Sequence, residues 1–543
     1  MADVEHLRSL THLKGLSDIY FARICSSATL RPPDGFGGRM TRPGADPSPD
    51  DMAKASTGRV HGLAALVLLA LALRLPLAFW PNIIHPDEIF QYLEPAWRLL
   101  GHDGIVTWEW RYGIRSWFLP TLLAGPAALG DLVAPDGAGA FVVPRLVAAL
   151  ASVSIVVSAW FFGARVSRTH AVVAAFVAAT WFEFILFAPH TLSEPLATAL
   201  IVPAALLLTD GPSQRRLVIG GALLGLAFLC RFQYAPAITV LAIGACWQCW
   251  RNAIPMVAGG LVLLAFAAVI DVAHGVIPFS WLVANVEQNL LHDRAAEFGV
   301  TSWVTYLVSF LVVWSVAIVP LAWAIWRGFR HAPLLLAVAL VNLGCHSLIG
   351  HKEYRFIFLS VVLLIIVAAL GSADWIQSLR ARRAWRPWAL PMITGAWALL
   401  SVLLVGASQE MRDDWMRGVG AARLAADLRG DPELCGLALY NLPFHLLPGR
   451  ERLSGSSPLY SLQPNDLLAQ GRLPAVVQAT NPAFNRVLAR PDSAADLPAG
   501  FSRRSCARVG NGDACIFARN GTCGAIPAAA PFTINDVLVR LDY

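Results

Sequence analysis

The sequence predicts an all-α protein with many membrane-spanning helices, followed by a small mixed α/β domain. Hydrophobic residues make up 56% of the 543 residues and charged residues only 14%, a composition typical of integral membrane proteins. Apolar runs that meet or approach the roughly 20 residues needed to cross a bilayer recur between residues 61 and 406. Ordinary buried helices of a soluble protein are not expected in such a series.

The chain divides into three predicted segments. Residues 1–55 are polar, rich in Pro and Gly and without an apolar core, which predicts a disordered cytoplasmic tail. Residues 56–406 form the predicted transmembrane domain, with about eleven spans and a range of about ten to thirteen. The predicted spans are approximately 61–80, 141–163, 171–188, 193–209, 217–230, 233–249, 254–271, 302–326, 331–349, 354–371 and 388–406.

Short loops rich in Arg orient these spans. They include Arg165 with Arg168, Arg327 with Arg330, and the cluster from Arg380 to Arg386, and the positive-inside rule places them in the cytoplasm. The net charge of +6 then reflects topology, so no nucleic-acid partner is expected. The first loop (81–140), the polar segments 190–194 and 351–355, and the C-terminal region share the opposite face.

The C-terminal region, 407–543, is expected to form a small mixed α/β domain outside the cytoplasm. Its β-like runs are 437–440 and 474–478. An oxidising compartment would permit a disulfide among four cysteines, although the sequence does not decide which of them pair. These are Cys435, Cys506, Cys515 and Cys523.

Two acids directly follow the first predicted span, in the motif His85-Pro86-Asp87-Glu88. A carboxylate beside the membrane can accept the proton of an attacking hydroxyl, and an adjacent acid can tune its pKa. Proline and carboxylates are also favoured in the first turn of a helix, so these acids could merely cap one. The apolar segment 113–130, broken by prolines, predicts an interfacial helix in the same loop.

A cationic segment on the same predicted face contains His351, Lys352 and Arg355. If it is helical, residues 351 and 355 lie one turn apart with 352 beside them, so the three could face one phosphate. Side chains that snorkel from a helix end would give the same pattern. Arg231 could contact the same phosphate or anchor the chain at the interface.

The residues around both motifs resemble glycosyltransferase family 22, the α-mannosyltransferases of lipid-linked oligosaccharide and GPI-anchor assembly. The closest branch adds the third mannose of the GPI anchor and has bacterial relatives. The resemblance runs from about residue 60 to about 410. It is carried by His85 to Glu88, Gln91 to Pro95, Thr107 to Trp110, Arg115 with Ser116, and His351 to Phe356.

The resemblance implies a GT-C membrane fold, a polyprenyl- or dolichyl-phosphate mannose donor, and a glycan or glycolipid acceptor at the bilayer. Inversion of the donor linkage would give an α-mannoside. The presumed base of the family maps onto Asp87, with Glu88 in support, and Lys352 becomes the preferred phosphate contact. Acceptor or sugar contacts are expected from the polar residues nearby, which are His85, Gln91, Glu109, Arg115, His190 and Glu194.

No cofactor and no metal site are expected, because no His, Cys or Asp cluster has metal-ligand spacing. Arginine strongly outnumbers lysine, which indicates a GC-rich genome. We therefore expect a bacterial inner membrane with the site facing the periplasm, or the endoplasmic reticulum lumen in a eukaryote. Two rival functions remain open: a flippase of lipid-linked sugars, which would need polar residues at mid-span, and a GT-C enzyme that moves another polyprenyl-linked sugar or a whole glycan.

Overall fold

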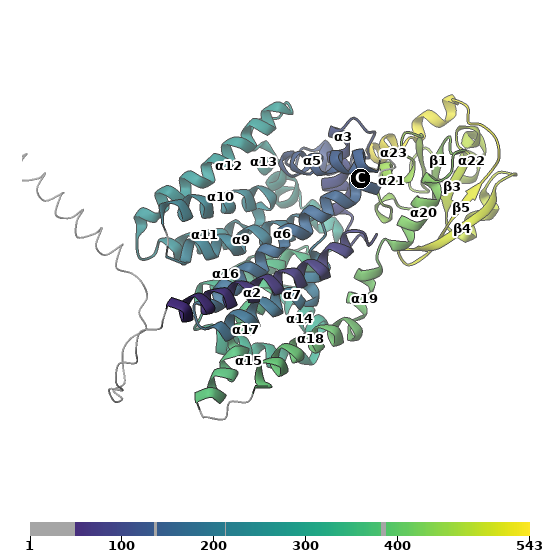
Figure 1. The fold of residues 1–543 in the computed structure, drawn as a ribbon. Coiled ribbons are helices and arrows are strands. Elements are labelled where there is room, and N and C mark those ends of the chain that lie inside the picture. The colour runs from purple at the N-terminus through teal and green to yellow at the C-terminus, as the bar shows by residue number, and fades with distance from the viewer. Residues whose placement is uncertain (1–48, 135–137, 212, 382–386) are drawn as a thin grey trace, which may run out of the picture.

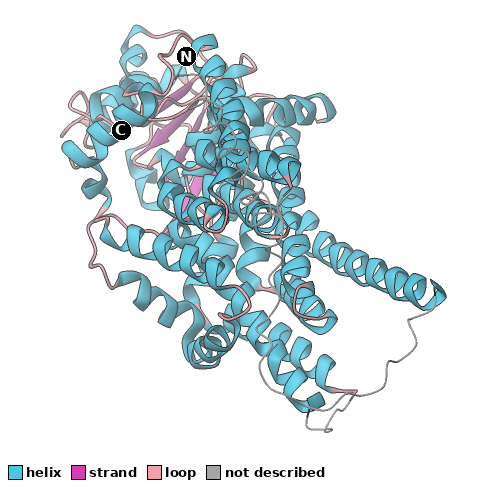
Figure 2. Cartoon of the chain, turned by 90° about the vertical axis from the view of Figure 1, so that its left-hand side faces the viewer, coloured by secondary structure: helices cyan, strands magenta, loops and turns pink. Residues whose placement is uncertain are grey.

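The computed structural model describes residues 49–543 apart from 135–137, 212 and 382–386. Helices dominate the chain as far as Arg429, and the strands that the structure describes all lie from Leu437 onward. The helical bundle and the strands occupy opposite sides of the molecule in Figure 1, and Figure 2 shows the strands gathered in one region among many helices. Most of the predicted 1–55 tail lies outside the described residues.

The bundle is built from seventeen α-helices among the described residues. They are α2 (Pro49–Arg74), α3 (Glu94–Leu99), α4 (Trp108–Arg111), α5 (Phe118–Val133), α6 (Ala138–Ala164), α7 (Arg168–Thr180), α8 (Phe182–Phe187), α9 (Ser193–Thr209), α10 (Gln214–Cys230), α11 (Ala235–Cys246), α12 (Ala253–Ala273), α13 (Ser280–Val286), α14 (Thr305–Trp314), α15 (Ile318–Gly328), α16 (Pro333–Leu348), α17 (Phe358–Ala381) and α18 (Ala389–Ala407). Helix α2 begins at Pro49, so helical structure starts before the predicted end of the tail.

Six helical segments among the described residues are long and apolar enough to cross a membrane. They are Val60–Ala78, Ala138–Ala164, Trp250–Ala273, Thr305–Gly328, Tyr354–Leu379 and Ala389–Ala407. Four shorter apolar helices accompany them, at Phe118–Val133, Ser193–Thr209, Phe232–Cys246 and Pro333–Leu348. Helix is present in each of the eleven predicted ranges, while the number of spans stays a prediction.

Helix α17 is the most enclosed of the long helices, and it packs on α7, α15 and α16. Glycines allow its close approach to α15. A β-carbon at Gly328 would collide with the backbone carbonyl of Val367, and one at Gly371 would collide with that of Ala324. Small residues let helices pack backbone to backbone inside a bilayer. The buried position of α17 matters for the site, because the segment just before it reaches the cavity described below.

The C-terminal region combines helices with one mixed sheet of five strands. The strands are β1 (Leu437–Tyr440), β2 (Leu459–Leu462), β3 (Arg486–Ala489), β4 (Ser502–Val509) and β5 (Gly512–Ala518), in the order β2-β1-β3-β5-β4. Strand β1 pairs in parallel with β2 and β3, whereas β5 pairs antiparallel with β3 and β4. Its helices are α19 (Gln409–Met416), α20 (Val419–Arg429), α21 (Arg450–Leu453), α22 (Leu473–Thr480) and α23 (Ile534–Leu541).

One predicted strand of this region is wrong. The run 474–478 lies inside helix α22, not in a strand. Pro474 falls in the first turn of that helix, where its missing N–H costs no hydrogen bond. Only Leu473, Val477 and Thr480 of the helix are buried, at a helical spacing that a five-residue window does not reveal.

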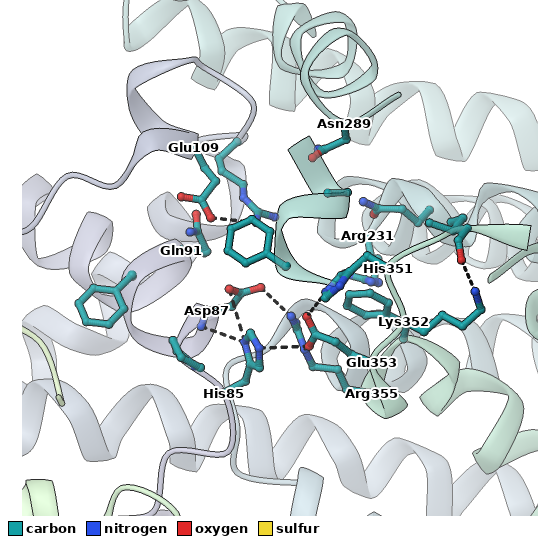
Figure 3. A pocket seen from close by; sticks show the side chains of 18 of the residues that line it. His85, Asp87, Gln91, Glu109, Arg231, Asn289, His351, Lys352, Glu353 and Arg355 are labelled. Atoms are coloured by element: carbon teal, nitrogen blue, oxygen red, sulfur yellow. Dashed lines mark hydrogen bonds and ion pairs between the residues drawn. The ribbon is translucent and has the colours of Figure 1, made fainter. Parts of the chain in front are cut away.

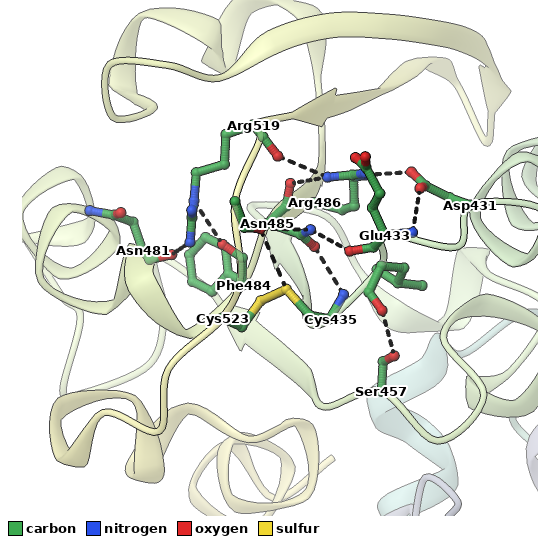
Figure 4. The surroundings of a disulfide bond; sticks show 12 residues. Asp431, Glu433, Cys435, Ser457, Asn481, Phe484, Asn485, Arg486, Arg519 and Cys523 are labelled. Atoms are coloured by element: carbon green, nitrogen blue, oxygen red, sulfur yellow. Dashed lines mark hydrogen bonds and ion pairs between the residues drawn. A yellow bond between two sulfur atoms is a disulfide. The ribbon is translucent and has the colours of Figure 1, made fainter.

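Two disulfides join the four late cysteines. Cys435 pairs with Cys523, 88 residues away, and Cys506 pairs with Cys515. The second pair lies directly across the register of β4 and β5. Figure 4 shows the Cys435–Cys523 bond beside Asn485, whose Oδ1 accepts from the backbone N–H of Cys435 at 3.1 Å. The sequence suggested one disulfide and left the pairing open; the sheet register brings Cys506 and Cys515 together.

Candidate active site

The acidic motif lies where the first loop turns into a helix. Asp87 is the N-cap of a π-helical turn, Glu88–Leu93, which continues into α3. The carbonyl of Pro86 accepts from the N–H groups of Ile89 and Phe90. The predicted helix start is therefore present. Its wider π-type turn is a geometry often found at functional sites.

Arg145 anchors the loop before this motif. Its fully buried guanidinium donates to the carbonyls of Trp80 and Asn82 at 2.8 and 3.2 Å and to Asn82 Oδ1 at 3.0 Å. Its Nε lies 3.8 Å from Glu88. Sequence reasoning missed this residue, although an arginine inside an apolar helix is costly without partners and so is a signal in itself.

A cavity of about 880 Å³ opens beside Asp87. Its wall comes from five parts of the chain: the first loop, Phe187 of α8, the region around Arg231, the segments between α12 and α17, and the C-terminal region. Figure 3 shows several of its charged side chains turned toward one another. The predicted site residues that line it are His85, Asp87, Gln91, Glu109, Arg115, Arg231, His351, Lys352 and Arg355.

Arg355 connects the acidic motif to the cationic segment across 268 residues of sequence. Its Nη2 donates to Asp87 at 2.8 Å, its Nη1 to Glu194 at 2.7 Å, and its Nε to Glu353 at 2.5 Å. Each guanidinium nitrogen thus has a carboxylate partner. The side chain is 6% exposed, so these pairs are shielded from water.

His85 closes the network on the other side of Asp87. Its Nδ1 accepts from the backbone N–H of Asp87 at 3.2 Å and lies 3.4 Å from the Asp87 carboxylate. Its Nε2 lies 3.1 Å from Glu353. Figure 3 shows His85 linked to both Asp87 and Glu353, with Arg355 next to Glu353. Glu353 belongs to the motif that the sequence singled out, but no role had been predicted for it.

The electrostatics of the network keep Asp87 ionised. Burial by itself raises the pKa of this carboxyl, but Arg355, and after it His85, outweigh burial and hold the pKa well below its usual range. At Glu353 burial likewise raises the pKa of the carboxyl, but Arg355 and His351 outweigh burial. The pKa of Glu353 is therefore also lowered. Asp87 is therefore an unprotonated carboxylate at neutral pH, as a proton acceptor must be.

Glu88 faces away from the cavity. It is fully buried, lies 2.6 Å from His190 Nδ1, and accepts from the backbone N–H of Thr191 at 3.3 Å. Burial opposes ionisation, but His190 and Arg145 lower the pKa of Glu88 below its usual value. Glu88 and His190 together tie the first loop to the segment before α9, and neither lines the cavity.

The segment 351–355 is not the helix on which its predicted geometry depended. Residues 351–353 are irregular, and a 3₁₀ turn begins only at Tyr354. The extended conformation of Glu353 separates the three cations, so they do not share a helical face. Arg355 turns inward to the carboxylates, while His351 pairs with Glu353 at 2.9 Å.

Lys352 has only neutral partners among the described residues. Its Nζ donates to the carbonyls of Thr301, at 3.0 Å, Ile349 and Gly350. Carbonyl oxygens satisfy its protons without cancelling its charge. Arg231 is different, because its Nη1 lies 3.0 Å from Glu194 and its guanidinium stacks over Phe356 at 4.6 Å. Glu194 itself lies behind the cavity wall, where it binds Arg231 and Arg355.

The C-terminal region supplies cavity residues that the sequence did not indicate. They include Phe444, His445 and Tyr543, Glu410 and Asp414 of α19, and Arg417 just after that helix. Burial raises the pKa of Asp414 to about 6, against the opposing charge of Arg417. No local pattern marks these residues, since they reach the site only through the fold of a separate segment.

The described part of the chain has one group of side chains close enough to hold a metal ion. It consists of His170, His331 and Asp374 and does not line the cavity. Asp87, Glu194 and Glu353 of the site each pair with Arg355.

Comparisons with known proteins agree on one family. Residues 65–411 match the family described as Alg9-like mannosyltransferases. "GPI mannosyltransferase 3" of Yarrowia lipolytica is 29% identical over 402 residues, which are 70% of this chain and 73% of that protein. Human "GPI alpha-1,2-mannosyltransferase 3" is 26% identical over 312 residues, so the match covers 54% of each chain.

A solved structure shares the fold. ArnT from Cupriavidus metallidurans, crystallised bound to undecaprenyl phosphate, superposes with a TM-score of 0.55 over 87% of this chain and all of its own, at 15% sequence identity. This likeness confirms the predicted GT-C fold.

Proposed function

The chain belongs to the Alg9-like mannosyltransferase family, and on that premise we propose that it transfers mannose from a polyprenyl-phosphate donor to a hydroxyl of a lipid-linked glycan. The linkage inverts, so the product is an α-mannoside. The observation that carries the proposal is the 2.8 Å contact between the Asp87 carboxylate and Arg355 within one cavity. It joins a base and a cation that lie far apart in the sequence.

Asp87 acts as the general base. The acceptor hydroxyl gives its proton to the carboxylate while its oxygen forms a bond to the anomeric carbon of the mannose. The bond from that carbon to the phosphate oxygen breaks, and the electron pair leaves with the polyprenyl phosphate. A positioned base contributes about 10²- to 10⁴-fold to such a step. Glu88 supports Asp87 by fixing the loop that carries it, through His190 and Arg145.

Cations of the cavity stabilise the leaving phosphate. Lys352 is best suited, because its charge is not already neutralised by a carboxylate. Arg355 must hold Asp87 in place and is engaged by three carboxylates, so it contacts the phosphate only if one of them is displaced. His351 and Arg231 line the same cavity, and Gln91, Glu109 and Arg115 face the sugar or the acceptor from the first loop.

The cavity faces the extracytoplasmic side. The disulfides of the C-terminal region support this orientation, because they require an oxidising compartment. In a bacterium that compartment is the periplasm, and the membrane is the inner one. The undecaprenyl phosphate of ArnT supports a polyprenyl carrier for the donor.

The test is transfer by purified Asp87→Asn enzyme from labelled polyprenyl-phosphate mannose. We expect turnover to fall by about 10²-fold or more, with donor binding nearly unchanged. Asp492→Asn, at an exposed position, is the matched control. Undiminished turnover in Asp87→Asn would reject its role as base.

The donor is tested separately. Membrane enzyme is incubated with a panel of labelled polyprenyl-phosphate hexoses, and mass spectrometry identifies the glycolipid product. Addition of one mannose is expected. Addition of another sugar, or of a preassembled glycan, would reject the mannose donor, and movement of lipid-linked sugar without a new glycosidic bond would identify a flippase.

A further inference from the structure

Three metal-ligating side chains meet far from the cavity. His170 lies in the first turn of α7, His331 in the turn between α15 and α16, and Asp374 near the end of α17. Figure 1 shows α7, α16 and α17 packed in the same part of the bundle. Along α17, Asp374 is about 24 Å from the helix start beside the cavity, at about 1.5 Å per residue. The cluster therefore cannot take part in the sugar transfer.

The three ligand atoms are already close together. Asp374 Oδ1 lies 3.1 Å from His170 Nε2 and 2.9 Å from His331 Nε2, and the candidate ligand atoms all fall within 4.8 Å of one another. In a tetrahedral zinc site with bonds of about 2.0 to 2.1 Å, ligand atoms are about 3.3 Å apart. Only small side-chain movements separate the observed arrangement from such a site.

The burial of His170 and its contact with Ser167 favour metal binding. His170 is fully buried, and its ring is held by Ser167, whose Oγ lies 2.8 Å from Nδ1 and accepts from the backbone N–H of His170. Metal-binding histidines commonly donate their second N–H to such a partner, which leaves Nε2 free to bind the metal. Here that Nε2 points at Asp374.

We propose that His170, His331 and Asp374 bind one divalent transition-metal ion of the zinc class. Two imidazoles and one carboxylate suit zinc better than magnesium or calcium, which prefer oxygen ligands. Three protein ligands leave a fourth position for water. The ion fastens α7 and the α15–α16 turn to α17, and its binding is independent of the proposed transfer reaction.

The alternative is a hydrogen-bonded network without metal. In that state each Nε2 carries a proton and donates to Asp374. The two states make opposite predictions about metal content. The experiment therefore measures metal directly in the full-length protein, purified in detergent without a polyhistidine tag.

Zinc is added, free metal is removed by dialysis, and bound zinc is measured by mass spectrometry. We expect about one zinc per chain, as three protein ligands and one water imply. Cobalt in place of zinc should give the visible absorption of a four- or five-coordinate site, which tests the site without any mutation. Zinc near background in the folded wild type, or octahedral cobalt absorption, would overturn the proposal.

Variants locate the site. Asp374→Asn and His331→Ala should lower zinc affinity by more than about 100-fold, because each removes a direct ligand. His292→Ala, at an exposed position, should retain full zinc. Added zinc should raise the melting temperature of the wild type but not of Asp374→Asn. Zinc binding that survives in a folded Asp374→Asn protein would contradict the assignment.

Discussion

At the scale of single residues, the cationic side chains of the cavity differ in the partners that they already have. Arg355 is surrounded by Asp87, Glu194 and Glu353, so its charge organises the site. Lys352 donates only to carbonyl groups and keeps its full charge for a ligand. Both belong to the segment that the sequence singled out, yet their environments differ because the backbone there is irregular.

Lys352→Ala should weaken donor binding. A hydrogen bond to a charged group contributes about 1.5 to 3 kcal/mol, so the KM for the polyprenyl-phosphate donor should rise by about 10- to 100-fold with a smaller change in kcat. Steady-state kinetics with varied donor measure this. Lys352→Arg retains the charge and should recover part of the affinity, whereas an unchanged donor KM in Lys352→Ala would place the phosphate elsewhere.

Arg355→Gln should change the pH dependence of transfer. Arg355 opposes the effect of burial on Asp87 and lowers its pKa. Without that charge the pKa rises, and the base becomes protonated at a higher pH. The acid limb of the kcat/KM profile should therefore move to higher pH than in the wild type. A limb that stays in place, or moves to lower pH, would show that another group is the base.

At the scale of elements, helix α3 and the C-terminal region are joined by a buried carboxyl. Glu94 Oε1 accepts from the backbone N–H groups of Ile105 at 2.9 Å and Arg450 at 3.0 Å. Its side chain is fully buried. Burial raises the pKa of Glu94 from 4.5 to about 7, despite these two hydrogen bonds.

Stability should therefore fall as pH rises through this window. In the folded protein Glu94 keeps its proton up to about pH 7, whereas the unfolded chain loses it near 4.5, so the folded state binds more protons between these values. Its contribution to the free energy of unfolding should drop by about 3 kcal/mol from pH 4.5 to above 7.

Thermal unfolding from pH 4.5 to 8 tests the role of Glu94. Glu94→Gln cannot ionise and should flatten the decline in melting temperature across that range. Glu297→Gln, with a side chain that is 67% exposed, is the control and should follow the wild type. Equal slopes in Glu94→Gln and the wild type would mean that Glu94 is ionised throughout.

At the scale of the whole molecule, the C-terminal region closes over the first loop. Asn535 of α23 accepts from the backbone N–H of Val106 at 2.9 Å and donates to the carbonyl of Gly104 at 3.0 Å. Arg111 donates to the carbonyls of Tyr543 and Leu538. Since Tyr543 also lines the cavity, these contacts decide how the cavity is bounded.

Asn535→Ala should loosen that closure. It removes two hydrogen bonds, each with a net contribution of about 0.5 to 1.5 kcal/mol, so the protein should lose about 1 to 3 kcal/mol of stability and show a higher acceptor KM. Melting temperature and kinetics with varied acceptor measure both effects. Asn511→Ala, exposed in the turn between β4 and β5, is the control. Unchanged kinetics would mean that the contact only stabilises the fold.

Local sequence patterns were sufficient to predict many of the helices and the family of this protein. Apolar runs between residues 60 and 406 predicted the ranges in which the structure has helix, because crossing a bilayer demands a continuous apolar helix. The motifs around Asp87 and His351 indicated the family, which the match over residues 65–411 confirms. Asp87 was separated from Glu88 as the preferred base, and the structure places only Asp87 at the cavity.

Tertiary structure decided which residues that lie far apart in the sequence come into contact. The contacts of Arg355 with Asp87, the disulfide of Cys435 with Cys523, and the meeting of His170 with Asp374 join residues 268, 88 and 204 positions apart. Periodicity and capping describe interactions within a few turns of helix, so they specify which elements form. They do not specify which elements meet, because that depends on how whole helices and strands pack against one another.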